Sequence, residues 1–267
     1  MLNKSFAITI LALALALALD ASFPSDSPAQ PETCPLGVIS CSTRSAGVDS
    51  CCSPTYGLLV LTQQWHTELG PSDEFTLHGL WPDTCSGQQT GNSGCDSSRL
   101  YTNITEIVKP DNGNNNNPLL FQDMNTYWSS YTGNNNKFWS HEWNKHGTCV
   151  TTLNPRCYGS SYIKYKDVRD YFSTALRLRN KYNLYEALSD KGIEPSEDTK
   201  YTAAEFKSAI KEGLGIEVAV KCKSGALSEI WAWFNVRDTI VYVPSKDALV
   251  SDSCPSTFIY PPKDNAE

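Results

Sequence analysis

The segment from Phe138 to Cys149, FWSHEWNKHGTC, concentrates reactive side chains in a chain that has 4 histidines altogether. If it is a helix turning roughly 100° per residue, one face roughly 140° wide carries most of them. The residues on that face are Phe138, His141, Glu142, Lys145 and His146. Trp143 and Asn144 point elsewhere, so the chemistry is collected on one side.

Two histidines, a carboxylate and an ammonium can perform acid–base chemistry without a metal. Histidine has an ordinary pKa of about 6.5, so one ring can accept a proton while another donates one. Lys145 supplies a positive charge that suits an anionic transition state, and Glu142 can orient a histidine or keep it charged. The set suits phosphoryl transfer with an internal nucleophile, as when the 2′-hydroxyl of RNA attacks its own phosphodiester.

Two other interpretations compete with this one. A zinc site of the His-Glu-x-x-His type needs histidines one helical turn apart, but the fifth position of this segment's HEWNK is Lys145. A salt-bridged surface helix with one or two buried histidines would need no chemistry at all. We therefore expect no metal here and look for a second group of reactive residues.

A second motif, FTLHGLWPD (75–83), places His78 next to Gly79, where a backbone can approach a ligand closely. Trp81 and Asp83 follow at an expected turn. An aromatic plane beside a carboxylate is a plausible pocket for a nucleobase, because the ring stacks and the carboxylate accepts from an exocyclic amine. Core packing is the alternative for Trp81.

Hydrophobic patterns indicate the elements that must position these residues. Strands are predicted at 56–65 and 75–83, the second turning at Pro82, and three closing strands at IEVAVKC, SEIWAWFNV and TIVYV. Helices are predicted at 118–131, 162–184 and 202–215, the last with a Thr-x-x-Glu capping box and a terminal glycine. Helices and strands do not alternate regularly, which favours the α+β class. The asparagine-rich stretches DNGNNNN and GNNNK are expected to be surface loops.

The amino terminus has the layout of a secretory signal peptide. Lys4 precedes an apolar run from Phe6 to Leu19, which is shorter than the roughly 18–20 residues that a membrane-spanning helix needs. We expect a signal peptide at 1–21, a disordered leader or short propeptide at 22–33 and a single domain at 34–267. The protein is therefore expected to be secreted, with Asn103 in its one sequon outside the signal as a candidate glycosylation site.

Ten cysteines in an exported chain predict five disulfides. Neighbouring cysteines rarely bond each other, so Cys51 and Cys52 should have partners in different parts of the fold. The residues themselves leave about 945 pairings open. The formal charge of −7 and the pI near 5.2 argue at first sight against a polyanionic partner, and suggest that any action on RNA would occur at acidic pH.

Together, FTLHGLWPD and FWSHEWNKHGTC resemble the two active-site motifs of the ribonuclease T2 family, secreted transferase-type ribonucleases, almost residue for residue. The resemblance covers roughly residues 34–260, and the cysteines look like those of fungal members. It implies an α+β fold with a central antiparallel sheet and flanking helices. It also implies a monomeric, cofactor-free enzyme that acts on single-stranded RNA and needs no membrane or protein partner.

The resemblance assigns roles to the reactive residues. His146 resembles the general base, His78 the general acid and His141 the phosphate-binding histidine. Glu142 and Lys145 look like the pair that stabilises the phosphorane.

For the bases, Trp81 and Asp83 match the primary site and Phe138 the secondary one. A tyrosine that some fungal members have after the first motif has no match in TCSGQQTG. His66 lies outside both motifs and is expected to be structural.

The resemblance further implies a complete disulfide pairing. The pairs are Cys34 with Cys52, Cys41 with Cys85, Cys51 with Cys157, Cys95 with Cys149 and Cys222 with Cys254. Two rival functions remain, a catalytically silent binding protein of the same fold and a metal-dependent phosphodiesterase. The presence of all the motif histidines, the glutamate and the lysine favours catalysis over the first.

Overall fold

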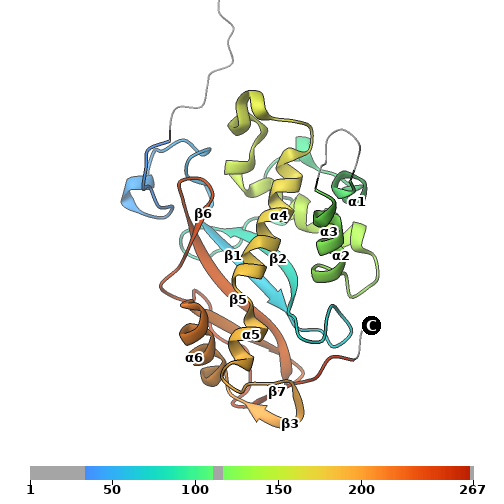
Figure 1. The fold of residues 1–267 in the computed structure, drawn as a ribbon. Coiled ribbons are helices and arrows are strands. Elements are labelled where there is room, and N and C mark those ends of the chain that lie inside the picture. Colours follow the sequence, from blue (N-terminus) through green and yellow to red (C-terminus); the bar gives the residue numbers. More distant parts are fainter. Residues whose placement is uncertain (1–33, 111–116, 265–267) are drawn as a thin grey trace, which may run out of the picture. The chain divides into compact units, whose positions relative to one another are not determined.

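The computed structural model describes residues 34–110 and 117–264, all within one compact unit (Figure 1). The expected signal peptide and leader and most of the first asparagine-rich stretch lie outside these residues. The strands are β1 (Leu58–Gln64), β2 (Thr76–Asp83), β3 (Ser196–Tyr201), β4 (Val218–Lys223), β5 (Ala226–Arg237), β6 (Val241–Pro244) and β7 (Phe258–Tyr260). The helices are α1 (Ile104–Val108), α2 (Pro118–Tyr127), α3 (Asn135–Lys145), α4 (Lys166–Lys181), α5 (Leu184–Ser189) and α6 (Ala203–Leu214).

One seven-stranded sheet organises the fold, in the order β2-β1-β5-β7-β3, with β4 and β6 also paired to β5. All pairs are antiparallel except β5 with β7, which meet in parallel at Ala226 and Ile259. The predicted α+β class is confirmed, and the expected antiparallel sheet is correct apart from this parallel contact.

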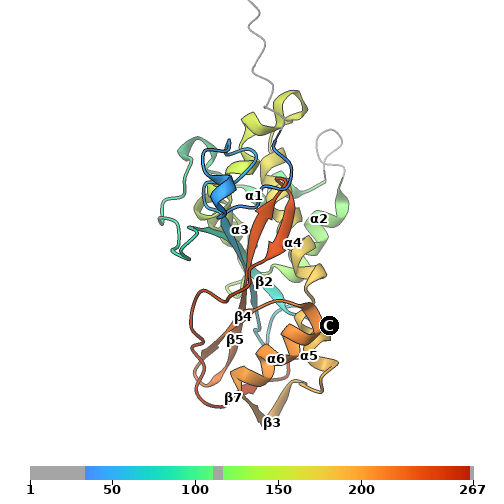
Figure 2. The same ribbon diagram turned by 90° about the vertical axis from the view of Figure 1, so that its left-hand side faces the viewer.

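Helix α4 packs against β1 and β2, and Figure 2 shows α4, α5 and α6 on the same side of the sheet. Tyr171 and Phe172 of α4 are fully buried in the main hydrophobic cluster. The Tyr171 hydroxyl donates to the Leu80 carbonyl of β2 at 2.9 Å. This contact anchors the strand that carries the first motif.

Three details of the sequence prediction differ from the structure. β2 does not turn at Pro82 but continues to Asp83, with Pro82 opposite Leu59. A proline can stand in this strand because β2 is at the edge of the sheet, where a missing N–H is tolerated. GNNNK is a loop only up to Asn134, because the Asn134 side chain accepts from the Lys137 N–H and the last three residues form the first turn of α3. The long helix begins only at Lys166, after Tyr165 in a left-handed conformation.

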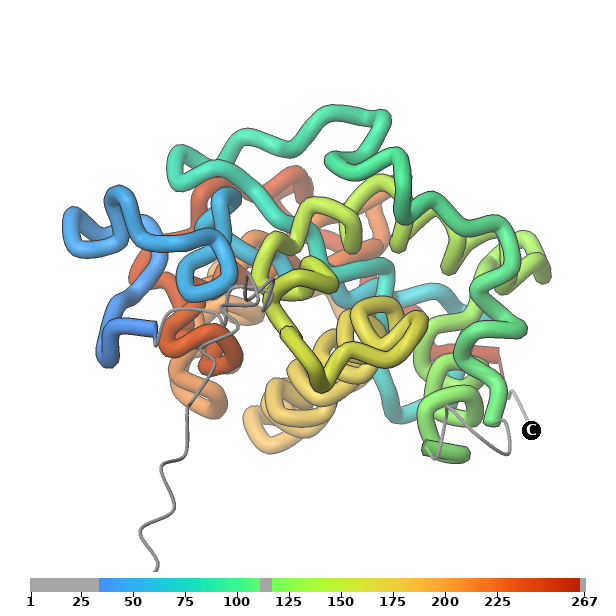
Figure 3. Tube along the Cα trace, turned by 90° about the horizontal axis from the view of Figure 1, so that it is seen from above, coloured from blue at the N-terminus to red at the C-terminus, as the bar shows by residue number. Residues whose placement is uncertain are grey.

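The amino-terminal segment runs beside the β5–β6 hairpin, as the view in Figure 3 shows. The Ser40 N–H donates to the Val236 carbonyl at 2.8 Å, and Ile39 forms a bridge with Arg237. Three disulfides, Cys34–Cys52, Cys41–Cys85 and Cys51–Cys157, fasten this segment. Little regular structure holds residues 34–57, so these covalent bonds are its main restraint.

Candidate active site

The two motifs face each other across one cleft, the first on β2 and the second on α3. α3 ends at Lys145, and His146 is its C-cap, with its N–H bonded to the Glu142 carbonyl. His146 is therefore placed by the way the helix ends rather than by continuation of the helical face. The Cys95–Cys149 disulfide anchors the chain three residues further on.

The cleft has a volume of about 110 Å³ and brings together all five residues expected to be catalytic. Its lining consists of His78, Trp81, Gln89, His141, Glu142, Lys145 and His146. Gln89 is a residue that sequence analysis missed. It lies in TCSGQQTG, where no matching tyrosine was found, and it forms a β-bridge with Asp83.

Trp81 joins the two motifs. Its Nε1 donates to Glu142 Oε2 at 2.8 Å, and its ring stacks on His146 with centroids 5.2 Å apart and planes 23° apart. The ring also meets His78 edge-on at 4.9 Å. A side chain at Gly79 would overlap both Glu142 Oε2 and Trp81 Nε1, so this glycine makes room for the hydrogen bond between them. The sequence alone did not suggest this role for Gly79.

His78 and His146 occupy opposite electrostatic environments. Burial opposes a charge on His78, but the hydrogen bond that His78 donates to Glu229 and the negative charges of Glu142 and Glu229 outweigh it and raise the pKa of His78. For His146, burial, Lys145 and the other histidines all disfavour the charged ring and lower its pKa to about 2. One histidine thus retains its proton while the other stays neutral.

Burial also shifts the pKa values of His141 and Glu142. The pKa of His141 is lowered by burial and by Lys145 and His78. Glu142 is fully buried, and burial raises its pKa to about 7. Within the described part of the chain, Glu142 Oε1 and His146 Nδ1 are buried and have no hydrogen-bond partner, so each is a polar atom whose burial no contact compensates.

The residues expected to bind bases lie around this cleft. Asp83 is only 5% exposed, and burial raises its pKa to about 6. Phe138 lies 5.8 Å from His78, centroid to centroid. Trp81 is 7% exposed, so a base can stack on it only if the indole moves away from its neighbours. His66 is not part of the cleft lining and stacks on Tyr131 at 5.9 Å.

The cleft residues also include a possible set of metal ligands. Three atoms that could bind a metal, one each from His141, Glu142 and His146, lie within 4.8 Å of one another. The spacing argument against a zinc helix does not cover this arrangement, because His146 lies beyond the helix.

Glu229 is the second residue that sequence analysis missed. It lies on β5, in the predicted strand SEIWAWFNV, and its Oε1 is 2.6 Å from His78 Nδ1. The sequence signal was a single charged residue within a mostly apolar predicted strand. Its proximity to His78 depends on long-range strand pairing, which local patterns do not reveal.

The five disulfides of the structure are the same pairs that the resemblance implies, with Cys51 bonded to Cys157 and Cys52 to Cys34. Asn103, the candidate glycosylation site, is exposed at the N-cap of α1. None of the helices in residues 34–110 and 117–264 has the length and hydropathy that crossing a bilayer requires.

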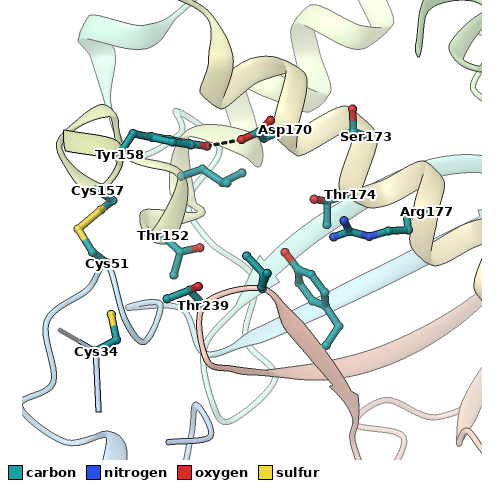
Figure 4. A pocket seen from close by; sticks show the side chains of 13 residues that line it. Cys34, Cys51, Thr152, Cys157, Tyr158, Asp170, Ser173, Thr174, Arg177 and Thr239 are labelled. Carbon is teal, nitrogen blue, oxygen red and sulfur yellow. Dashed lines mark hydrogen bonds between the residues drawn. A yellow bond between two sulfur atoms is a disulfide. The ribbon is translucent and has the colours of Figure 1, made fainter. Parts of the chain in front are cut away.

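A larger cavity of about 550 Å³ lies away from these motifs, between α4, the Tyr158 segment and the β5–β6 turn (Figure 4). Its one carboxylate, Asp170, accepts from the Tyr158 hydroxyl at 2.9 Å and from Lys166 at 2.8 Å. That carboxylate is already paired, and no histidine lines the cavity. The smaller cleft therefore remains the candidate active site.

Comparison with known proteins agrees with this geometry. A model of the ribonuclease T2 family matches residues 56–249, which include both motifs. The chain belongs to the ribonuclease T2 family. Among the relatives of this T2-family chain, ribonuclease Rh of Rhizopus niveus is 46% identical over 231 residues, covering 86% of this chain and 93% of the relative.

Two further relatives extend the comparison to another sequence and to a solved structure. Ribonuclease Trv of Hypocrea rufa is 39% identical over 240 residues, 87% of this chain and 99% of that protein. Actibind, described as a T2 ribonuclease, has a sequence 39% identical to this chain. Its crystal structure superposes with a TM-score of 0.76 and covers 85% of this chain and 95% of that one. The T2-family fold therefore extends over most of the chain.

Proposed function

We propose that this T2-family chain is a secreted endoribonuclease that cleaves single-stranded RNA without a metal. The observation that carries the proposal is the pair His78 and His146, which flank Trp81 in one cleft with pKa values shifted in opposite directions. Two histidines whose pKa values differ in this way are suited to act as acid and base in one reaction. The relatives named as ribonucleases support the same substrate.

In the first step, neutral His146 removes the proton from the 2′-hydroxyl of RNA. The 2′-oxygen forms a bond to phosphorus while the bond from phosphorus to the 5′-oxygen breaks, and His78 gives its proton to that leaving oxygen. The products are a 2′,3′-cyclic phosphate and a free 5′-hydroxyl. In the slower second step, water opens the ring to a 3′-phosphate, with the two histidines exchanging roles.

A pentacovalent phosphorane forms as the 2′-oxygen bonds to phosphorus and before the bond to the 5′-oxygen has fully broken. This phosphorane carries additional negative charge. Lys145 and protonated His141 can hold its oxygens by charge. Glu142 suits this position because its pKa of about 7 keeps the carboxyl group protonated in acid. A protonated carboxyl group can donate a hydrogen bond, whereas a carboxylate would repel the phosphate.

Base recognition is assigned to Trp81, Asp83 and Phe138. With a pKa of about 6, Asp83 is mainly protonated in acid and offers both a donor and an acceptor to a base edge. We further propose a monomer without cofactor or membrane attachment, made with a signal peptide at 1–21 and a leader at 22–33 before the domain at 34–267. Sugar at Asn103 is consistent with export.

The proposal predicts that the protein cleaves RNA in the presence of EDTA and leaves DNA intact, because DNA lacks the 2′-hydroxyl nucleophile. Cleavage of defined dinucleotides, followed by chromatography, should show the cyclic phosphate first and the 3′-phosphate later. A loss of cleavage in EDTA that added metal restores would identify a metal-dependent phosphodiesterase instead. RNA binding without any cleavage would identify a silent relative.

The pH dependence of kcat/KM is predicted to be a bell with its maximum at roughly pH 4–6, below the ordinary histidine pKa of about 6.5. The acidic limb reflects protonation of His146, whose pKa is lowered, and the basic limb reflects loss of protons from His141 and then from His78. Rising pH also restores the repulsion between RNA and a chain of net charge −7. Measurement at constant ionic strength tests this, and a maximum at or above pH 7 would contradict it.

A further inference from the structure

Glu229 makes two hydrogen bonds that fix its carboxylate. Oε1 lies 2.6 Å from His78 Nδ1, and Oε2 accepts from Trp231 Nε1 at 2.7 Å. Glu229 and Trp231 are two residues apart on β5, so their side chains leave the same face of the sheet. The side chain of Glu229 is 18% exposed, and both of its oxygens are occupied.

The position of this carboxylate is built into the sheet. Glu229 lies opposite Gln64 of β1, and Gln64 lies opposite Thr76 of β2, two residues before His78. The His78 backbone is held as well, because its carbonyl accepts from Trp128 Nε1 at 2.8 Å. The pair formed by His78 and Glu229 is therefore held by three neighbouring strands and a buried tryptophan rather than by a loop.

This hydrogen bond determines which nitrogen of His78 carries protons. A carboxylate only accepts, so Nδ1 is the protonated nitrogen toward Glu229 in both charge states of the ring. Nε2 is then the nitrogen that gains and loses the proton used in catalysis. A histidine oriented through its other nitrogen in this way has a defined tautomer and direction.

Several charged or titratable groups act on His78 besides Glu229. When it is ionised, Glu142 raises the pKa of His78, and Lys145 lowers it. His66, His141 and His146 each interact with His78 electrostatically. Burial also opposes the charge on His78. Glu229 is the carboxylate hydrogen-bonded to the ring, so it is expected to make the largest specific contribution to keeping the ring protonated.

We propose that Glu229 is a positioning residue that orients His78 and holds its proton, so that Nε2 can protonate the leaving 5′-oxygen. This inference rests on the proposed ribonuclease function and adds a third member to its acid–base pair. Trp231 has a supporting part, because it fixes the second oxygen of the carboxylate. Glu229 itself does not contact the reacting atoms.

The test compares Glu229→Gln with the wild type and with Glu197→Gln, which removes the same charge at an exposed site on β3. Nuclear magnetic resonance of the histidine rings, assigned with His78→Ala, measures the pKa of His78 without requiring activity. The loss of an adjacent opposite charge should lower that pKa by roughly 1 pH unit or more in Glu229→Gln. The basic limb of kcat/KM should move down with it, while Glu197→Gln should resemble the wild type.

A second readout uses the leaving group. Cleavage of a dinucleotide, which expels an alkoxide, should fall more in Glu229→Gln than cleavage of a nucleoside 3′-(4-nitrophenyl phosphate), whose leaving group needs no proton. In the His78→Ala background, Glu229→Gln should have little further effect, because the two act as a unit.

Equal losses on both substrates, with an unchanged His78 pKa and basic limb, would reduce Glu229 to a structural role and overturn the inference. A wild-type protein that cleaves no RNA would instead refute the proposed function. The pKa measurement would then still decide whether Glu229 controls the His78 proton.

Discussion

The His146→Ala and His78→Ala variants are each expected to lose at least ~10²-fold in kcat/KM for RNA, since positioned acids and bases typically contribute that much. The loss should arise in kcat, because neither proton transfer is needed for binding. His146 is 5% exposed and packs on Trp81, so near-ultraviolet circular dichroism must show that each variant keeps its tertiary structure. Retention of more than a tenth of the activity by a folded variant would contradict its assigned role.

The two histidines can also be told apart, because their tasks differ. With a 4-nitrophenolate leaving group, the His78→Ala variant should recover much of its lost rate, since the acid is no longer needed. The His146→Ala variant should not recover, because the 2′-hydroxyl still has to lose its proton. The opposite pattern would mean that the acid and the base have been exchanged.

The lysine of the cleft offers a comparison with a built-in control. Lys145 lines the cleft, whereas Lys137 is exposed in the first turn of the same helix. Removal of either lysine changes the net charge of the protein by the same amount. A loss confined to the Lys145 variant would thus measure a local contact with the phosphate.

Much of the fold could be predicted because the deciding interactions are local. The Thr202 side chain and Glu205 form the predicted capping box, and Gly215 ends that helix with a φ of +69°. The apolar run YGLLVLTQQW likewise contains β1, all of whose residues are buried. In both cases the residues that determine the element lie within it.

Part of the site could not be predicted, because it depends on contacts between distant segments. Residues 78 and 229 meet only through the pairing of β2 with β1 and of β1 with β5. The helical-face argument correctly grouped His146 with Glu142, yet His146 lies at the C-cap and its orientation follows from the chain beyond α3. The stacking of Trp81 on His146 could not be predicted either, because it is a contact between two distant segments.

Reduction of all the disulfides is expected to unfold the domain in the absence of denaturant. Each bridge stabilises a folded domain by roughly 2–4 kcal/mol, so five contribute about 10–20 kcal/mol. Whole domains are stable by only about 5–15 kcal/mol. Near-ultraviolet circular dichroism during titration with dithiothreitol, with thiols counted in parallel, measures the effect. A native spectrum with ten free thiols would contradict it.

One bridge should affect catalysis separately from stability. Cys95–Cys149 closes a sequence separation of 54 residues and anchors the chain just after His146, whereas Cys34–Cys52 spans 18 residues in the amino-terminal segment. The chain-entropy relation makes their effects on the free energy of unfolding differ by only about 1 kcal/mol. Paired serine substitutions at either bridge should therefore destabilise the domain to a similar extent. At a temperature where both variants remain folded, only loss of Cys95–Cys149 should lower kcat, because only that bridge holds the segment that places the base. Equal kcat values in the two variants would mean that α3 and Trp81 position His146 without help from the disulfide.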